Sequence, residues 1–178
     1  LFDLDADPST IDAHLTLGGL GALVARTAGI RIPGAFDGVD VALRVLLRGR
    51  VLHSASPLDV ASRVTRALGE PIETGIDRLT HLAPTAARIA EAGSARLREH
   101  GVSASKARAI VSVARLVASD ELKLEPGSDV SATMRALMEI AGIGDRLATL
   151  IVMRTLGWPD AFPLGCESMA HTVDARSA

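Results

Sequence analysis

Apolar residues recur every three or four positions along most of this chain of 178 residues, which is the spacing of amphipathic helices. Capping residues mark where several of these stretches begin. The clearest predicted helices cover 37–47, 56–68, 103–119 (from Ser103 or Ser105) and 129–138, and another follows Asp145 as its cap. Shorter helices are predicted over 8–15, 85–92 and 94–100. Because runs of β-branched residues are short, the pattern predicts an all-α chain.

Glycines mark where the helices are predicted to end. Gly69, Gly101 and Gly157 each follow the last apolar position of a helical stretch. Residues 70–84 are predicted to form a connecting loop, and the glycines between positions 18 and 21 predict a loose stretch. No internal repeat is apparent in this order of elements.

The spacing also assigns side chains to buried and exposed faces. On the helix after Ser103, the basic residues Lys106, Arg108 and Arg115 are predicted to lie on the outer face. On the helix over 56–68, the buried stripe is predicted to comprise Leu58, Val60, Ala61, Val64 and Leu68.

The composition, with 48% hydrophobic and 22% charged residues, is typical of globular proteins. No run of 18 apolar residues is present, so no membrane span is predicted, and the acidic first residues do not resemble a signal peptide. The single cysteine, Cys166, excludes a disulfide framework and a four-cysteine metal site, and favours a reducing cytoplasm. The net charge of −2 weakens the case for nucleic-acid binding, because phosphate contacts usually leave a basic surface.

Residues 137–148 carry the clearest chemical signal. Two predicted helices meet there at Gly142, Ile143 and Gly144. Glycines lack a Cβ, so their backbone amides can approach a phosphate, and the second helix directs its positive end to the same place. Ile143 is expected to fill the space between the helices. Such a hairpin holds a DNA backbone without a basic surface; the alternative is an ordinary αα-hairpin whose glycines serve only the turn.

Residues 137–163 resemble the hairpin and following stretch of the helix-hairpin-helix DNA glycosylase superfamily. The stretch over 154–163, RTLGWPDAFP, is similar to the alkylpurine branch, the DNA-3-methyladenine glycosylase II family. Four further segments match that family in the same order, so the resemblance covers residues 1–163. These segments are 1–4, 31–34, 79–85 and 106–109.

The resemblance implies an all-α, two-lobed helix-hairpin-helix glycosylase fold that is incomplete at its C-terminal end. It divides the chain into three parts. Residues 1–35 are expected to be a linker from a missing upstream domain together with a first helix. Residues 36–163 are expected to form a helical glycosylase-like domain with its hairpin at 137–148, and residues 164–178 an irregular tail.

The resemblance also implies a role in base-excision repair. Members of this family bind double-stranded DNA, flip a damaged nucleotide and hydrolyse the N-glycosidic bond of alkylated purines such as 3-methyladenine. Arg146 stands where bifunctional relatives carry a nucleophilic lysine, so a monofunctional glycosylase is expected. No cofactor is required, and the backbone carbonyls of Met138, Ile140 and Ile143 are candidate ligands of a monovalent cation. A cytoplasmic, nucleoid-associated protein of bacterial type is implied.

The chain departs from the family at the catalytic position. The family's aspartate lies four residues after the phenylalanine of the Asp-Ala-Phe-Pro stretch, and that position is Cys166 here. A neutral thiol does not stabilise a developing cation as a carboxylate does. Glu167, one residue further on, is the candidate catalytic carboxylate. Three interpretations stay open: an active glycosylase, a catalytically inactive DNA-binding remnant, and a purely structural helical domain.

Basic residues outside the glycine turn are further candidates for DNA binding. Arg146 follows the turn directly, and Arg50 lies where the family keeps a residue that fills the gap left by the flipped base. Lys106 and Arg108 are candidate phosphate contacts. For exposed arginines and lysines such as these, the alternative is a side chain that faces solvent only. Neither the oligomeric state nor the preferred lesion is predicted.

Overall fold

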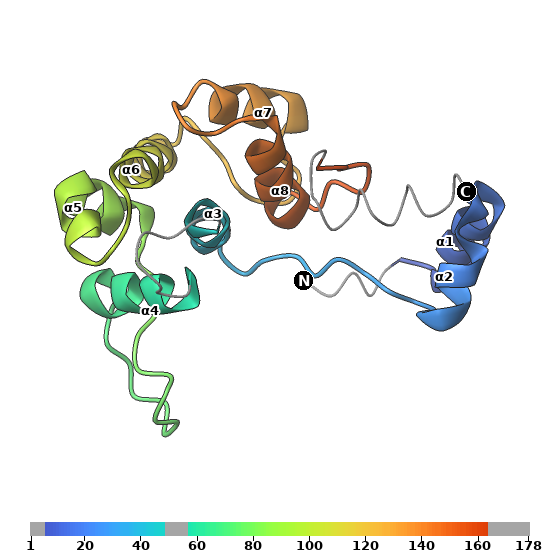
Figure 1. Cartoon of the computed structure of the whole chain (residues 1–178), viewed down its shortest axis with the longest axis horizontal. Helices are drawn as coiled ribbons and strands as arrows, with labels where there is room; N and C mark the ends of the chain where they lie inside the picture. The colour runs from blue at the N-terminus through green and yellow to red at the C-terminus, as the bar shows by residue number, and fades with distance from the viewer. Residues whose placement is uncertain (1–5, 49–56, 164–178) are drawn as a thin grey trace. The chain divides into compact units, whose positions relative to one another are not determined.

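The computed structural model describes residues 6–48 and 57–163, and the chain divides into two compact units, residues 1–36 and 37–178. Figure 1 shows helices joined by loops, and the only isolated β interaction among the described residues is a bridge between Pro71 and His81. The expectation of an all-α chain is confirmed. The elements are α1 (Pro8–Leu15), the π-helical turn η1 (Thr16–Leu20), α2 (Gly21–Arg26), α3 (Gly38–Leu47), α4 (Pro57–Leu68), α5 (Ala86–Glu99), α6 (Ala104–Ala118), α7 (Val130–Met138) and α8 (Asp145–Thr155). Among the described residues, no helix is long and apolar enough to cross a membrane.

The first unit is built on α1 and α2. The Asp7 carboxylate caps α1, accepting hydrogen bonds from the Ser9 amide at 3.0 Å and the Thr10 hydroxyl at 2.6 Å. These bonds, that of Thr10 first, lower the pKa of Asp7 from its ordinary value. The stretch predicted to be loose contains a kink: Gly19 takes a φ of +84°, which is not helical, so the helical path breaks within the π-helical turn η1 between α1 and α2.

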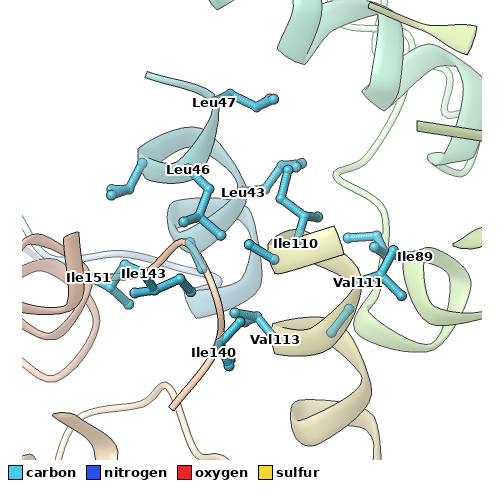
Figure 2. Packing of buried hydrophobic residues seen from close by; sticks show 14 of the residues in the cluster. Leu43, Leu46, Leu47, Ile89, Ile110, Val111, Val113, Ile140, Ile143 and Ile151 are labelled. Carbon is cyan, nitrogen blue, oxygen red and sulfur yellow. The ribbon is translucent and has the colours of Figure 1, made fainter. Parts of the chain in front are cut away.

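The core of the second unit is centred on α3. This helix packs against α4, α6 and α8, while α5 packs against α6 and α7 against α8. Figure 2 shows where these faces meet, with Leu43 and Leu46 of α3 close to Ile110 of α6. Burying such leucine and isoleucine side chains contributes about 1.5–3 kcal/mol each, so α3 stabilises the packing of α4, α6 and α8 around it.

The predicted caps place most helix starts correctly. Asp37 accepts the amide of Val39 at 2.7 Å, and Asp129 accepts that of Ala132 at 2.9 Å. Thr85 caps α5, in which Gly93 has a φ of +70° and separates the two short helices that the sequence predicted. The prediction for α8 was wrong by one residue: Gly144 occupies the cap and Asp145 is the first helical residue.

One predicted core residue of α4 lies outside the core. Val60, Ala61, Val64 and Leu68 are buried as expected, but Leu58 is 69% exposed. At 3.6 residues per turn, Leu58 lies roughly 100° around the helix from the centre of that stripe. The prediction of a buried helical face was therefore correct, and only the inclusion of Leu58 in it was wrong.

Candidate nucleic-acid interface

A tight turn joins α7 to α8 at the hairpin that the sequence singled out. Glu139 is the C-cap of α7, and the carbonyl of Ile140 accepts the amide of Ile143 at 3.0 Å. Gly142 closes the turn with a φ of +96°, a conformation that side chains with a Cβ rarely adopt. The glycine is therefore required by the turn itself, whatever else the turn binds.

Ile143 fastens this turn to the core. Its side chain is 3% exposed, and Leu137, Ile140 and Ala148 on either side are buried too. Figure 2 shows Ile143 beside Ile151 and pointing towards the α3 face. Ile143 is therefore buried in the core, as expected of an apolar residue between two turn glycines. The glycines on either side of it are exposed.

The glycines leave the start of α8 open. A Cβ built on Gly142 or on Gly144 meets no heavy atom of the described residues within 4 Å. Within residues 6–48 and 57–163, no side chain caps α8 at Gly144, and the first amides of the helix have no partner within it. These amides and the positive end of the helix form a surface that accepts an anion without displacing any side chain.

Two exposed charges flank that surface on the first turn of α8. Asp145 is favourable to the helix, because a negative charge opposes the dipole at its start, but it repels an incoming phosphate. Arg146, the next residue, is also exposed and brings a positive charge to the same turn. The two formal charges cancel, so the attraction of this turn for an anion comes from its backbone amides.

The carbonyls of Met138, Ile140 and Ile143 are the candidate ligands of a cation. Met138 ends α7, and the other two residues lie in the turn. Ile140 already accepts one hydrogen bond there and keeps a second lone pair. Neutral carbonyl oxygens of this kind suit a monovalent cation. No group of three or more His, Cys, Asp or Glu side chains that could hold a metal ion occurs among residues 6–48 and 57–163.

Lys106 and Arg108 behave differently although both lie on α6. Arg108 is exposed, as predicted. Lys106 is not on the outer face: its Nζ donates to the carbonyls of Leu47 at 3.1 Å and Arg48 at 3.0 Å, at the end of α3. Its long apolar stem makes this reach possible. Partial burial lowers the pKa of the Lys106 ammonium from its ordinary value.

Three sequence-predicted residues lie outside the described residues. These are Arg50, Cys166 and Glu167, so the catalytic assignment rests on the sequence alone. One further basic contact was not predicted: Arg63 of α4 donates from Nε to the carbonyl of His100 at 3.0 Å. No local pattern could reveal this bond, since it joins residues 37 positions apart.

Known proteins match most of this sequence. Residues 1–37 match the family model described as the AlkA N-terminal domain. A probable bifunctional transcriptional activator/DNA repair enzyme AlkA of Mycobacterium tuberculosis is 34% identical over 164 residues, covering 92% of this chain and 32% of the relative. DNA-3-methyladenine glycosylase 2 of Escherichia coli is 28% identical over 158 residues, covering 89% of this chain and 52% of the relative. The chain thus spans about a third to a half of the length of these relatives.

The fold also matches a solved structure. It is similar to that of Clostridium acetobutylicum 8-oxoguanine glycosylase/lyase in complex with double-stranded DNA containing cytosine opposite 8-oxoG, with a TM-score of 0.77. The identity is 19%, and the match covers 97% of this chain and 59% of the other. A likeness at this identity concerns the fold alone. It confirms the helix-hairpin-helix glycosylase fold that the sequence predicted.

Proposed function

We propose, from the premise that this chain is a relative of the helix-hairpin-helix DNA glycosylases, that it binds double-stranded DNA through the α7–α8 hairpin. The observation that carries the proposal is the contrast inside the turn. Ile143 is buried and holds the backbone in place, while Gly142 and Gly144 are exposed and have open space around them. That open face leaves the first amides of α8 accessible to a phosphate.

In the bound state a DNA phosphate lies against the first amides of α8. Arg146 and Arg108 supply long-range attraction, which falls as salt rises. A monovalent cation on the carbonyls of Met138, Ile140 and Ile143 would add positive charge at the same turn. Arg50 is the candidate that enters the duplex where a nucleotide is flipped out. A DNA-bound role of this kind places the protein in the cytoplasm, with the nucleoid.

The proposed reaction is hydrolysis of the N-glycosidic bond of an alkylated purine such as 3-methyladenine. The alkylated base is already cationic, so it leaves as a neutral base with the electron pair of the broken bond. The oxygen of water bonds to C1′ of the sugar, and a carboxylate takes the proton; Glu167 is the candidate. Arg146 stays protonated and forms no Schiff base, so the chain is a hydrolase without lyase activity.

Two findings support alkylated purines rather than oxidised ones as substrates. The Escherichia coli relative is named a DNA-3-methyladenine glycosylase and matches by sequence. The 8-oxoguanine enzyme matches at 19% identity, where the likeness concerns only the fold. One fold hosts different substrates, so the fold match does not favour oxidised bases.

A second candidate function is DNA binding without catalysis. The observation in its favour is Cys166, which stands where the family keeps its catalytic aspartate. A protein of this kind would use the same hairpin, so a binding assay does not separate the two functions.

The test is release of 3-methyladenine from alkylated duplex DNA, with Glu167→Gln and Cys166→Asp as variants. The proposed enzyme releases the base and loses release in Glu167→Gln. Cys166→Asp, which restores the family's carboxylate, is expected to raise the rate by about a hundredfold. Ser168→Asp is the control, since it adds the same charge two residues away. If the wild type folds and binds DNA but releases no base, and only Cys166→Asp releases it, the chain is the inactive DNA-binding protein.

A further inference from the structure

Lys106 joins two helices that are far apart in the sequence. It lies on the first turn of α6, and its Nζ donates to the carbonyls of Leu47 and Arg48 at 3.1 and 3.0 Å. These are the last residue of α3 and its C-cap. The bonds span 59 and 58 residues, so Lys106 fixes the end of α3 to the start of α6.

The end of α3 needs such a partner. The last carbonyls of a helix have no amide partner within it, and they carry partial negative charge that a cation stabilises. Arg48 has an extended backbone, with φ −62° and ψ 152°, so the helical hydrogen-bond pattern stops there abruptly. An ammonium that donates to two carbonyls makes stronger bonds than a neutral donor.

Arg63 shows the same arrangement at another helix. Its Nε donates to the carbonyl of His100, the C-cap of α5. In both places a cation from a neighbouring helix satisfies a helix end inside the protein. Lys106 therefore has a structural role, to bond the carbonyls at the end of α3, which a solvent-exposed lysine does not have.

Arg48 is the residue that this bond holds in place. Its side chain is exposed, and within residues 6–48 and 57–163 it makes no ion pair. Arg44, one turn earlier on α3, is engaged by Asp40 at 2.7 Å. Since the Arg48 carbonyl is tied to Lys106, the Arg48 guanidinium extends from a fixed point of the backbone.

We propose that Lys106 is a positioning residue, which holds Arg48 as a phosphate contact for duplex DNA and does not itself bind the phosphate. This inference rests on the proposed DNA-binding function. It replaces the sequence-based expectation that Lys106 contacts phosphate directly. The rival role has a physical basis, because an ammonium has three donors and only two are used by the carbonyls.

A double-mutant cycle separates the two roles. The affinity for an undamaged fluorescent duplex is measured for wild type, Lys106→Met, Arg48→Met and the double variant. If Lys106 acts through Arg48, each single change lowers affinity about fivefold and the double change lowers it no further. If both side chains bind phosphate, the losses multiply to about 25-fold, and the salt slope of the double variant falls by about two phosphate contacts rather than one.

Controls tie each result to the contact. Lys106→Arg keeps the charge and the donors, and is expected to restore affinity to within about twofold. Arg108→Met removes an exposed charge on the same helix, and its loss is expected to multiply with that of Arg48→Met. The fluorescence of Trp158, the sole tryptophan, reports folding of each variant. If Lys106→Met does not fold, Lys106→Gln runs the same cycle.

The outcomes distinguish this inference from the proposed function. A wild type that does not bind duplex overturns the proposed function. A wild type that binds, with losses that multiply between positions 48 and 106, overturns only the positioning role. A Lys106→Met variant with unchanged affinity also overturns it.

Discussion

Two turns in this protein share one backbone design, the α5–α6 turn and the α7–α8 turn. Gly101 and Gly142 have φ of +94° and +96°. The apolar residue that follows each glycine is buried, with Val102 4% exposed and Ile143 3% exposed. Neither of the helices that follow has a side-chain cap bond. No internal repeat was expected from the sequence, but these two hairpins share a local backbone pattern.

The residues around each turn correspond as well. Leu97 and Leu137 precede the two glycines, Ala107 and Ala148 follow each glycine by six positions, and all four side chains are fully buried. The first hairpin has one residue fewer between its leucine and its glycine, and Ser103 replaces the second glycine. These two differences hide the correspondence in the sequence.

The two turns differ in what lies over them. A Cβ on Gly101 would meet a terminal nitrogen of Arg63 at 2.7 Å, whereas one on Gly142 would meet nothing within 4 Å. Arg63 therefore lies against the first turn, although Gly101 is exposed, and no described residue lies against Gly142 in the same way. A glycine at positive φ followed by a buried apolar residue forms the hairpin turn. Where no described side chain lies against that glycine, the turn is accessible to a phosphate.

The largest predicted effect is one that both turns share. Ile143→Ala is expected to lower the free energy of unfolding by about 2–4 kcal/mol, because it removes buried atoms that hold the turn. Val102→Ala is expected to cost about 2 kcal/mol, since it deletes fewer atoms. Urea unfolding followed by Trp158 fluorescence measures both. Leu58→Ala, at an exposed position, is the control and changes stability by less than about 0.5 kcal/mol. A small loss of stability in Ile143→Ala would show that Ile143 does not anchor the turn to the core.

The second-largest predicted effect is on stability when the glycine of each turn is replaced by alanine. Gly142→Ala costs about 1 kcal/mol of backbone strain at positive φ. Gly101→Ala carries the same strain and is expected to cost slightly more, because the new methyl must also move a terminal nitrogen of Arg63. Chemical denaturation of both variants measures the difference. In an Arg63→Met background the two glycine-to-alanine substitutions are expected to lower stability equally. A difference that persists there would show that the Arg63 contact is not its cause.

The smallest predicted effect concerns the acid at the open turn. Asp145→Asn is expected to raise duplex affinity about two- to threefold at low salt, because it removes repulsion of the phosphate. Stability is expected to fall by a few tenths of a kcal/mol, about what one helix-dipole charge contributes. Glu125→Gln, an exposed acid in the linker before α7, is the matched control. Equal gains from both variants would reflect net charge alone.

Helix starts were predictable because a cap is a local signal. Asp37 and Thr85 are short polar residues just before an apolar repeat, and the structure uses both as caps. The buried isoleucine of the open hairpin was predictable for the same reason: Gly142 and Gly144 enclose it within three positions.

The contacts that distinguish the two hairpins were not predictable from the sequence. Arg63 and Lys106 each bond a carbonyl of another helix, across 37 to 59 residues. In the sequence both resemble ordinary charged residues on the exposed face of a helix. Only the packing of α4 against α5 and of α3 against α6 brings these cations to helix ends. Which turn is covered is therefore a property of the tertiary structure.

Duplex affinity of Gly144→Asp, measured together with its stability, tests most directly whether the open α7–α8 turn binds DNA. Gly144 has an extended backbone with free space around it, so the new side chain fits, and an aspartate at a helix cap stabilises by a few tenths of a kcal/mol. The same carboxylate occupies the phosphate position, so affinity is expected to fall at least about tenfold. Gly144→Asn, similar in size and uncharged, is expected to lose much less. A Gly144→Asp variant that is stable and still binds duplex as tightly as wild type would contradict the account.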